Sequence, residues 1–260
     1  MRELSEINSD LDLCDEKILD LLKQRLGYVE EITDSKKALD LPILQPEQDK
    51  ERMKKFILAI GDHPYGEELQ AMVGQIESAG KRVESRNLFD FNIALIGFMG
   101  AGKSTVSRYL KQKLAMDEVD VDSVIVQDQN MPIKDIFAQF GEDYFRDCES
   151  KAIIKLQSRR QTIISCGGGA VVREENVANL KKTSRIVLLT ASPETVLERV
   201  KGSDERPILN GNMNVEFIKE LMEKRAELYR KAADVIIETD HKRVEQICEE
   251  LLRALVKLER

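Results

Sequence analysis

The residues with the clearest chemistry in this sequence form one glycine-rich run, Gly97-Phe98-Met99-Gly100-Ala101-Gly102-Lys103-Ser104-Thr105. The run fits G-x-x-x-x-G-K-[ST], in which small residues let backbone N–H groups close around phosphate oxygens. Lys103 can reach the β- and γ-phosphates of a nucleotide, and the Ser104 hydroxyl can ligate Mg²⁺. An apolar run precedes the motif and an amphipathic stretch follows it, so we expect the strand–loop–helix unit of a nucleotide site.

Two aspartates follow the next apolar run, residues 116–121. If this segment is a strand, Asp120 and Asp122 point to the same side at its carboxyl end, where the sites of α/β proteins form. Asp120 could then hold Mg²⁺ through water, and Asp122 could accept a hydroxyl proton. The alternative is that one of them only caps the helix expected after the strand.

Three arginines, Arg146, Arg206 and Arg225, could surround an anionic substrate and a transferring phosphoryl group. A lone surface arginine is usually solvated, so these three have meaning only as a set. A buried strand expected at 162–166 runs into three consecutive glycines, where backbone can approach a ligand closely. Arg206 lies in a polar stretch, residues 201–214, with a composition typical of a mobile lid.

The elements that must position these groups differ between the two parts of the 260-residue chain. Residues 89–260 alternate short apolar runs with amphipathic stretches, which predicts βαβ units. Residues 1–88 have a helical pattern throughout. Because domains usually have about 100–200 residues, the length allows one large or two small domains. The change of pattern favours two, at 1–88 and 89–260.

Composition excludes several classes of protein. Hydrophobic residues make up 42% of the chain and charged residues 33%, which is typical of a soluble protein with a core. The net charge of -7 argues against broad nucleic-acid binding. Apolar runs are shorter than the ~18 residues of a membrane helix, and the acidic start is unlike a signal peptide, so we expect a cytoplasmic protein. The four cysteines form no C-x-x-C pair, which argues against a zinc site.

The first helix, expected over about residues 3–39, carries a seam of apolar residues with coiled-coil-like 3-4 spacing: Leu4, Ile7, Leu11, Cys14, Ile18 and Leu21. At ~1.5 Å per residue this helix is roughly 55 Å long, more than the width of an 88-residue globule. It therefore predicts a partner chain, and so a homodimer. Further helices are expected from Pro46 to about Ile60 and from about Glu67 to Ser85.

Arg25 interrupts the continuation of that seam, and Lys36 lies three helical turns later on the same face. Two cations facing inward suggest an anion pocket between helices. The alternative is that both side chains extend along the rim of the bundle with their charges in water. Spacing alone does not separate these two interpretations.

The motifs of the second part together resemble the shikimate kinase family. The likeness is carried by GFMGAGKST, DVD at 120–122, IFAQFGEDYFR at 136–146, SCGGGAV at 165–171, RPIL at 206–209 and KRAELYR at 224–230. The resemblance implies a P-loop kinase fold, with a five-stranded parallel sheet flanked by helices. It also implies Mg²⁺-dependent transfer of the ATP γ-phosphoryl group to the 3-hydroxyl of shikimate.

The resemblance further implies roles for individual residues. Shikimate would be held by Asp122, Arg146, Gly168, Gly169 and Arg225, and catalysis would rest on Asp122, Lys103 and Arg206. ATP would contact Gly100, Ala101, Gly102, Lys103, Ser104, Thr105 and Arg206, with Arg199 and Lys242 as candidates on the adenine side, while Ser104 and Asp120 would serve the metal. A kinase for another polyol, such as gluconate, is the alternative; two arginines suit a carboxylate acceptor, although gluconate also carries one carboxylate.

Residues 1–88 resemble the all-helical chorismate mutase class, through LDLCDEKILDLLKQR and PILQPEQDKE. This likeness implies an all-α three-helix domain in which Arg25, Lys36, Asp49 and Glu84 contact chorismate. The sequence departs from the family at Asn8, where a helix-crossing arginine is expected, and at Gln45, Gln48 and Asp49, which replace an acid, an arginine and a glutamate. Lys50 or Arg52 could compensate, but helical register argues against both, because Asp49, Met53 and Phe56 fit the core face without a gap.

We therefore expect a kinase whose helical domain has weak or no mutase activity. The alternatives are a fully bifunctional enzyme and a kinase whose helical domain is a dimerisation and sensing module that binds chorismate or prephenate. The sequence does not choose among them.

Overall fold

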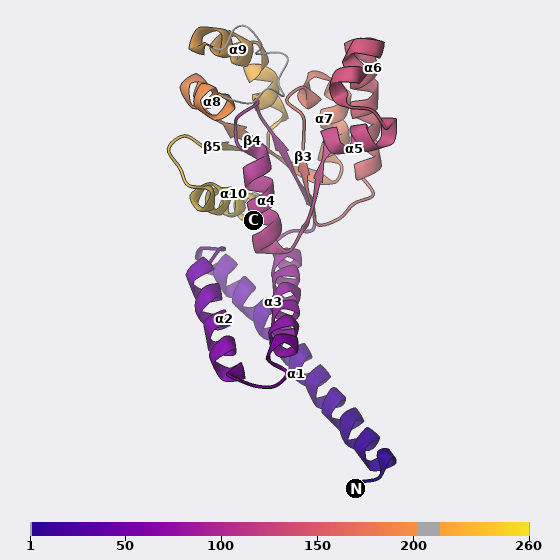
Figure 1. The fold of residues 1–260 in the computed structure, drawn as a ribbon. Coiled ribbons are helices and arrows are strands. Elements are labelled where there is room, and N and C mark those ends of the chain that lie inside the picture. Colours follow the sequence, from indigo (N-terminus) through magenta and orange to yellow (C-terminus); the bar gives the residue numbers. More distant parts are fainter. Residues whose placement is uncertain (1, 202–213, 260) are drawn as a thin grey trace. The chain divides into compact units, whose positions relative to one another are not determined.

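The chain consists of two compact units, Met1–Leu88 and Phe89–Arg260, shown in Figure 1. The structure is a computed structural model that describes residues 2–201 and 214–259. Arg206 and most of the stretch expected to form a lid therefore lie outside the described residues. Among the described helices, none is both long and apolar enough to cross a membrane.

The first unit contains three helices, α1 (Leu4–Ala38), α2 (Pro46–Ile60) and α3 (Gly66–Leu88). Pro46 suits the first turn of α2 because a proline lacks the N–H group that would be unpaired there. Gly61 ends α2 with φ 52°, a backbone conformation that glycine adopts without strain. The three-helix organisation expected for this part of the chain is confirmed.

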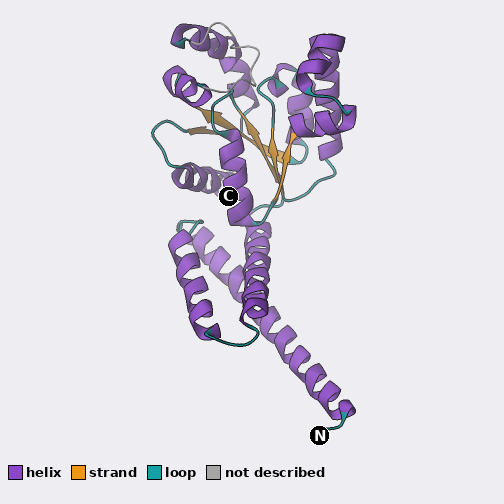
Figure 2. Cartoon of the chain, viewed as in Figure 1, coloured by secondary structure: helices purple, strands orange, loops and turns teal. Residues whose placement is uncertain are grey.

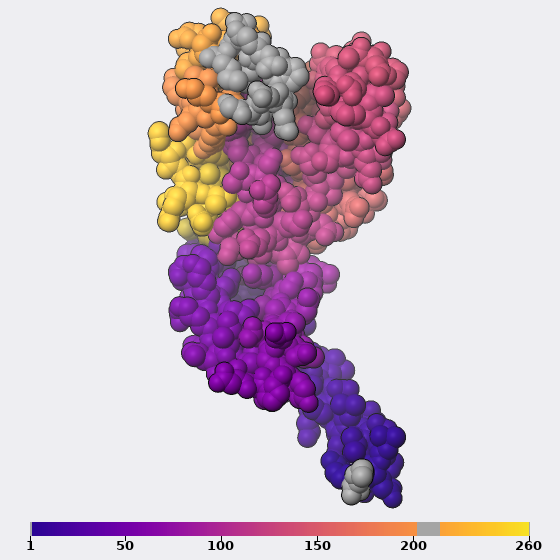
Figure 3. Space-filling view, in the orientation of Figure 1, coloured from indigo at the N-terminus to yellow at the C-terminus, as the bar shows by residue number. Residues whose placement is uncertain are grey.

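Helix α1 has little of the apolar burial that normally stabilises a helix. Its buried residues are Thr33 and Lys36, both polar. The apolar seam instead faces solvent, with Leu4, Leu11 and Leu21 exposed by 74%, 57% and 64%. The amino-terminal half of α1 extends beyond α2 and α3 of the same unit (Figures 1 and 3).

The second unit is built on a five-stranded parallel sheet with helices on both faces (Figure 2). The strand order is β2-β3-β1-β4-β5, with β1 Asn92–Ile96, β2 Asp117–Asp120, β3 Thr162–Ser165, β4 Ser184–Thr190 and β5 Val235–Glu238. Strand β1 lies at the centre, where Ala94 pairs with Ile164 of β3 and Ile186 of β4. The five-stranded parallel sheet expected for this part of the chain is therefore confirmed.

Two layers of helices bury the sheet. Helices α4 (Lys103–Leu114) and α10 (Val244–Leu258) pack together on one face. The other face shares a hydrophobic core with α5 (Val121–Gln129), α6 (Ile133–Leu156), η1 (Ala170–Val172), α7 (Glu174–Lys181) and α9 (Val215–Ala232). Helix α8 (Pro193–Val200) packs against α9 through a smaller cluster that includes Val196 and Ile218.

The parallel arrangement brings the carboxyl ends of the strands to one edge of the sheet. The glycine-rich loop follows β1, Asp120 ends β2 with Asp122 just beyond it, and the glycine run follows β3. Residues far apart in the sequence are thus placed side by side at this edge. Every described kinase-site residue named from the sequence lies there or on the helices beside it.

Candidate active site

The glycine-rich loop connects β1 to α4, as the motif requires. Gly97 has φ 142°, and a Cβ at this position would overlap the carbonyl oxygen of Leu189, so only glycine fits. Lys103 folds back over the loop, because its Nζ donates to the carbonyl oxygens of Gly97 at 2.9 Å and Phe98 at 3.1 Å. The ammonium group therefore lies beside the amino terminus of α4, where backbone N–H groups favour an anion.

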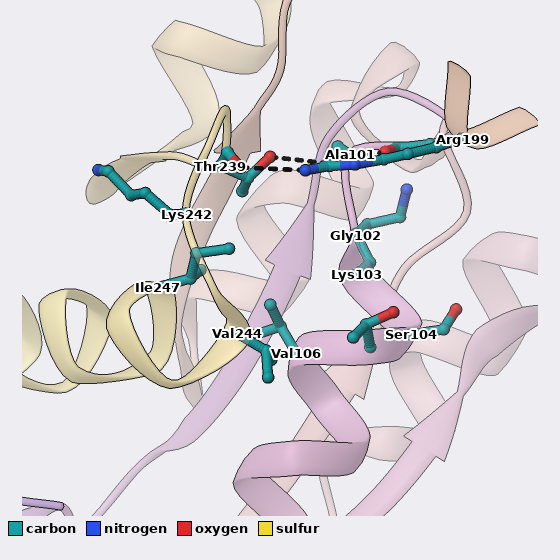
Figure 4. A pocket seen from close by; sticks show the side chains of 12 residues that line it. Ala101, Gly102, Lys103, Ser104, Val106, Arg199, Thr239, Lys242, Val244 and Ile247 are labelled. Carbon is teal, nitrogen blue, oxygen red and sulfur yellow. Dashed lines mark hydrogen bonds between the residues drawn. The ribbon is translucent and has the colours of Figure 1, made fainter. Parts of the chain in front are cut away.

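A pocket of about 450 Å³ opens beside this loop (Figure 4). It is lined by Gly100, Ala101, Gly102, Lys103, Ser104, Thr105, Val106, Arg199, Thr239, Lys242, Val244 and Ile247. Arg199 of α8 is fixed at the pocket wall, because its guanidinium donates to the carbonyl oxygen of Gly100 at 3.1 Å and to both oxygens of Thr239 at 2.9 and 3.0 Å. The structure thus brings together the described residues that the sequence analysis assigned to ATP.

Lys242 lines the same pocket, but its side chain points away from the loop in Figure 4. Its Nζ pairs with Glu250 at 2.6 Å. Thr239, Val244 and Ile247 complete this side of the pocket and were not singled out by the sequence. Thr239 could have been predicted to line the pocket, because it comes directly after β5, at the same edge of the sheet as the glycine-rich loop.

A second cleft, of about 360 Å³, adjoins the first and shares Lys103 and Ser104 with it. It is lined by Met99, Lys103, Ser104, Asp120, Asp122, Phe137, Phe145, Arg146, Glu149, Ser165, Cys166, Gly167, Gly168, Gly169 and Arg225. All the described residues that the sequence analysis assigned to catalysis, metal or shikimate are therefore in one cleft. Arg206 alone lies outside the described residues.

The two aspartates differ from the sequence expectation in one respect. Strand β2 ends at Asp120 and α5 begins at Val121, so Asp122 lies in the first turn of a helix and not in a strand. The reason is that Asp120 caps this helix, with its Oδ1 accepting the N–H of Ser123 at 3.0 Å. Asp120 therefore caps the helix, as the alternative interpretation stated. Both carboxylates still line the cleft, so Asp120 can also serve a metal there.

Asp122 is the carboxylate best suited to accept a proton. Its Oδ1 is buried and has no hydrogen-bond partner among the described residues. Burial raises the pKa of Asp122, and the nearby charge of Asp120 raises it further, while Lys103 and Arg146 act in the opposite direction. A carboxylate with an unsatisfied oxygen and a raised pKa is a stronger base than an ordinary exposed aspartate.

Arg146 is held rigidly in the cleft by two glutamates. Its guanidinium donates to Glu149 Oε2 at 3.0 Å and to Glu142 Oε1 at 2.9 Å. Glu149 is fully buried and its Oε1 has no hydrogen-bond partner among the described residues. Burial raises the pKa of Glu149, and the charge of Arg146 opposes that increase. The sequence analysis gave Glu149 no role, although its i,i+3 spacing from Arg146 was the available signal.

The glycine run after β3 is shaped by its neighbours. The carbonyl oxygen of Gly168 accepts from Arg225 Nη1 at 3.2 Å and from Tyr229 Oη at 2.5 Å. A Cβ at Gly169 would overlap the guanidinium of Arg146, whereas a Cβ at Gly168 would meet Tyr229 Oη at an ordinary 3.6 Å. Glycine at 169 thus allows Arg146 to lie directly against the backbone.

The helical unit has a pocket of its own, of about 90 Å³, which we call the helical-domain pocket. It is lined by Arg25, Val29, Ile32, Thr33, Lys36, Gln45, Gln48, Asp49, Arg52, Glu77, Gly80, Lys81 and Glu84. The inward-facing interpretation of Arg25 and Lys36 is therefore correct, and Asp49 and Glu84 lie in the same pocket.

Arg52 lines this pocket, although helical register argues against its compensating for the missing arginines. Its backbone lies outside the half-buried face formed by Asp49, Met53 and Phe56, as the register indicates. The long side chain nevertheless reaches the pocket, where it lies 3.8 Å from Glu77. Register fixes the direction of Cβ, but a four-bond side chain can reach round the helix from there.

Comparisons with known proteins agree with this geometry. Residues 99–256 match the family model of shikimate kinase, and residues 7–85 match that of chorismate mutase type II. The chain is 42% identical over 167 residues to the shikimate kinase of Thermodesulfovibrio yellowstonii, covering 64% of this chain and 96% of that protein. It is 44% identical over 161 residues to the shikimate kinase of Persephonella marina, covering 62% of this chain and 96% of that protein.

Solved structures give the same result. The shikimate kinase from Acinetobacter baumannii, solved in complex with shikimate, matches with a TM-score of 0.63 and 31% identity, over 67% of this chain and 98% of that one. The shikimate kinase from Aquifex aeolicus matches with a TM-score of 0.56 and 35% identity, over 65% of this chain and 98% of that one. The chain therefore belongs to the shikimate kinase family and carries, in addition, an amino-terminal domain of chorismate mutase type II.

Proposed function

We propose that this enzyme transfers the γ-phosphoryl group of ATP to the 3-hydroxyl of shikimate. The observation that carries the proposal is the convergence in one cleft of Lys103, the buried carboxylate of Asp122, and the guanidinium groups of Arg146 and Arg225. A cleft with two guanidinium groups suits an acceptor that has a carboxylate as well as a hydroxyl. The membership of the chain in the shikimate kinase family supports the same acceptor.

Each group has a part in the transfer. Arg146 and Arg225 hold the acceptor's carboxylate, beside the backbone of Gly168 and Gly169. The oxygen of the acceptor's hydroxyl forms a bond to the γ-phosphorus, while the bond from the γ-phosphorus to the β-phosphate oxygen breaks. Asp122 accepts the proton that this hydroxyl loses. Lys103 stabilises the negative charge on the transferring group. Arg206, assigned to the same task from the sequence, lies outside the described residues.

ATP occupies the pocket of about 450 Å³ in this proposal, with its phosphates on the glycine-rich loop and its base on the side of Arg199 and Lys242. Mg²⁺ fits the neighbouring oxygen donors, because Mg²⁺ takes one or two protein oxygens and keeps several waters. Ser104 would hold it directly, and Asp120 would hold it through water with the oxygen that does not cap α5. When bound, the metal neutralises charge on the β- and γ-phosphates.

A substrate panel tests the kinase assignment. The purified full chain should release ADP from ATP and Mg²⁺ rapidly with shikimate, and slowly with gluconate or without an acceptor. Faster ADP release with gluconate than with shikimate would contradict the proposal.

The same preparation should convert chorismate to prephenate slowly or not at all, because the helical-domain pocket has glutamines at positions 45 and 48 where the resemblance leads us to expect an acid and an arginine.

The helical domain also serves, in our proposal, to join two copies of the chain. The support is the exposed apolar seam of α1 and the absence of any buried residue in α2, within the part of the chain that the structure describes. We expect light scattering at micromolar concentration to give twice the chain mass of 29.6 kDa.

Substitution in the seam checks the same point. Leu11→Glu should lower the mass toward one chain, because it places a charge in the apolar contact. Ser9→Glu is the matched control, since residue 9 lies about 200° round the helix from residue 11 and is also exposed. A monomeric wild-type chain, or equal effects of the two substitutions, would contradict this assignment.

A further inference from the structure

The helical-domain pocket is filled with ion pairs made by the chain itself. Lys36 Nζ lies 2.7 Å from Glu84, and Arg25 Nη2 lies 2.5 Å from Glu77. Two longer pairs complete the set: Arg52 with Glu77 at 3.8 Å, and Lys81 with Asp49 at 4.0 Å. Each of the four described cations that line this pocket is therefore paired with a carboxylate of the same unit.

Glu77 differs from the other carboxylates of the pocket because it pairs with two cations. It faces two guanidinium groups, those of Arg25 and Arg52, and its side chain is only 15% exposed. Arg25 also donates to the carbonyl oxygen of Ile76 at 3.3 Å, so its guanidinium is anchored where Glu77 meets it. A carboxylate between two guanidinium groups is the arrangement that a bound anionic ligand would make.

The charges in the pocket decide what it can bind. Its lining contains four cations and three carboxylates, so a ligand with two carboxylates would leave the filled pocket with an excess of negative charge. The kinase cleft differs at one of its two guanidinium groups. Arg146 is paired with Glu142 and Glu149. Arg225, however, donates to the neutral carbonyl oxygen of Gly168 and keeps its positive charge available to a substrate. In the helical-domain pocket each described cation already faces a carboxylate.

We propose that the Glu77 carboxylate stands in for a ligand's carboxylate between Arg25 and Arg52, and so excludes small dicarboxylates from the helical-domain pocket. Glu77 is then the residue that sets the specificity of this pocket. The proposal deepens the proposed function of the helical domain, since it gives a physical reason for weak binding of chorismate. It does not depend on the kinase reaction.

Titration of the full chain with chorismate tests the proposal. Glu77→Gln keeps the shape of the side chain and removes its charge, leaving Arg25 and Arg52 to meet a ligand. Isothermal titration calorimetry should give an affinity for chorismate at least about tenfold higher in the variant than in the wild type, because like charges at a binding site oppose association strongly. The gain should shrink as salt is added, since it is electrostatic.

Two further variants keep the test specific. Glu68→Gln removes one negative charge from an exposed position on the same helix and should leave chorismate affinity at the wild-type level. Arg25→Gln combined with Glu77→Gln should remove the gain, because the released guanidinium is then absent. The melting midpoint and the rate of shikimate phosphorylation, measured on each sample, identify any variant that fails to fold.

Two results would overturn the proposal. Wild type could bind chorismate as tightly as a folded Glu77→Gln does, which would mean that Glu77 is no barrier. A folded Glu77→Gln could bind chorismate less tightly than wild type, which would make Glu77 a contact to the ligand. The kinase rate with shikimate is read separately, so failure of the kinase assignment would be distinguished from each of these.

Discussion

Replacing Asp122 with asparagine should lower kcat for shikimate phosphorylation roughly 10²- to 10⁴-fold, the usual range for loss of a general base. The asparagine keeps the size of the side chain in the first turn of α5 but cannot accept the hydroxyl proton. ATP affinity should stay near the wild-type value, because Asp122 lines the second cleft and not the pocket beside the glycine-rich loop. Coupled measurement of ADP release, with calorimetric titration of ATP, gives both quantities.

The pH profile of wild type provides an independent readout of the same residue. Burial raises the pKa of Asp122, so the proton-accepting form is lost at a higher pH than for an ordinary aspartate. We therefore expect kcat/KM to fall on the acid side at a pH above the normal range of aspartate titration. The residual activity of Asp122→Asn should lack that acid limb.

Asp120→Asn is the matched comparison for Asp122→Asn. It keeps an amide oxygen that can cap α5 through the N–H of Ser123, so the helix should remain in place. Its effect should fall mainly on the Mg²⁺ concentration needed for half-maximal rate. Equal losses of ATP affinity and of kcat in Asp122→Asn would instead show that Asp122 has a structural role.

The second large effect concerns Arg146 and the buried carboxylate beneath it. Arg146→Met should destabilise the fold by about 3–5 kcal/mol, because it leaves Glu149 buried without its cation. The same substitution should raise KM for shikimate strongly, since one of the two guanidinium groups of the cleft is lost. Adding Glu149→Gln should recover most of the stability, but it should not recover the affinity for shikimate.

The pH dependence of this destabilisation has a definite sign. Burial already raises the pKa of Glu149, and loss of Arg146 removes the charge that opposes the increase. A carboxyl group with a raised folded-state pKa costs stability above its unfolded pKa, and the cost disappears as pH falls and the group takes up its proton. Arg146→Met should therefore be most destabilised, relative to wild type, at neutral pH and least at acidic pH.

Urea unfolding of wild type, the Arg146→Met variant and the double variant, at neutral and acidic pH, measures these differences. Steady-state kinetics on the folded samples separates binding from stability. A double variant as unstable as Arg146→Met would show that the charge of Glu149 is not the cause. Recovery of shikimate affinity in the double variant would show that Arg146 does not hold the substrate.

Much of the fold follows from local patterns in the sequence. The helix starting at Pro46 and the strand–loop–helix unit around Lys103 both lie where spacing and flanking residues indicated. These features depend on neighbouring residues, so a sequence alone carries the information. The prediction that Asp122 lies in a strand is wrong, because the sequence does not show where the strand stops and the next helix begins. The cap that Asp120 forms starts the helix at Val121.

The site was less predictable than the fold, because it depends on contacts between distant elements. Glu149 has the sequence context of an ordinary helical glutamate, and only the packing of α6 shows that it is fully buried under Arg146. Glu77 lies on α3, while the guanidinium groups it faces come from α1 and α2. Helical spacing gives the face of each residue but not which long side chains meet.

The exposed seam of α1 has a consequence for thiol chemistry. Cys14 is exposed on this seam, whereas Cys148, Cys166 and Cys248 are buried in the second unit. Burial raises the pKa of both Cys166 and Cys248, so these thiols are also poor nucleophiles. In a chain dissociated by Leu11→Glu, a fluorophore maleimide should then modify a single position on α1, Cys14, whereas a partner copy packed on the seam should shield that thiol.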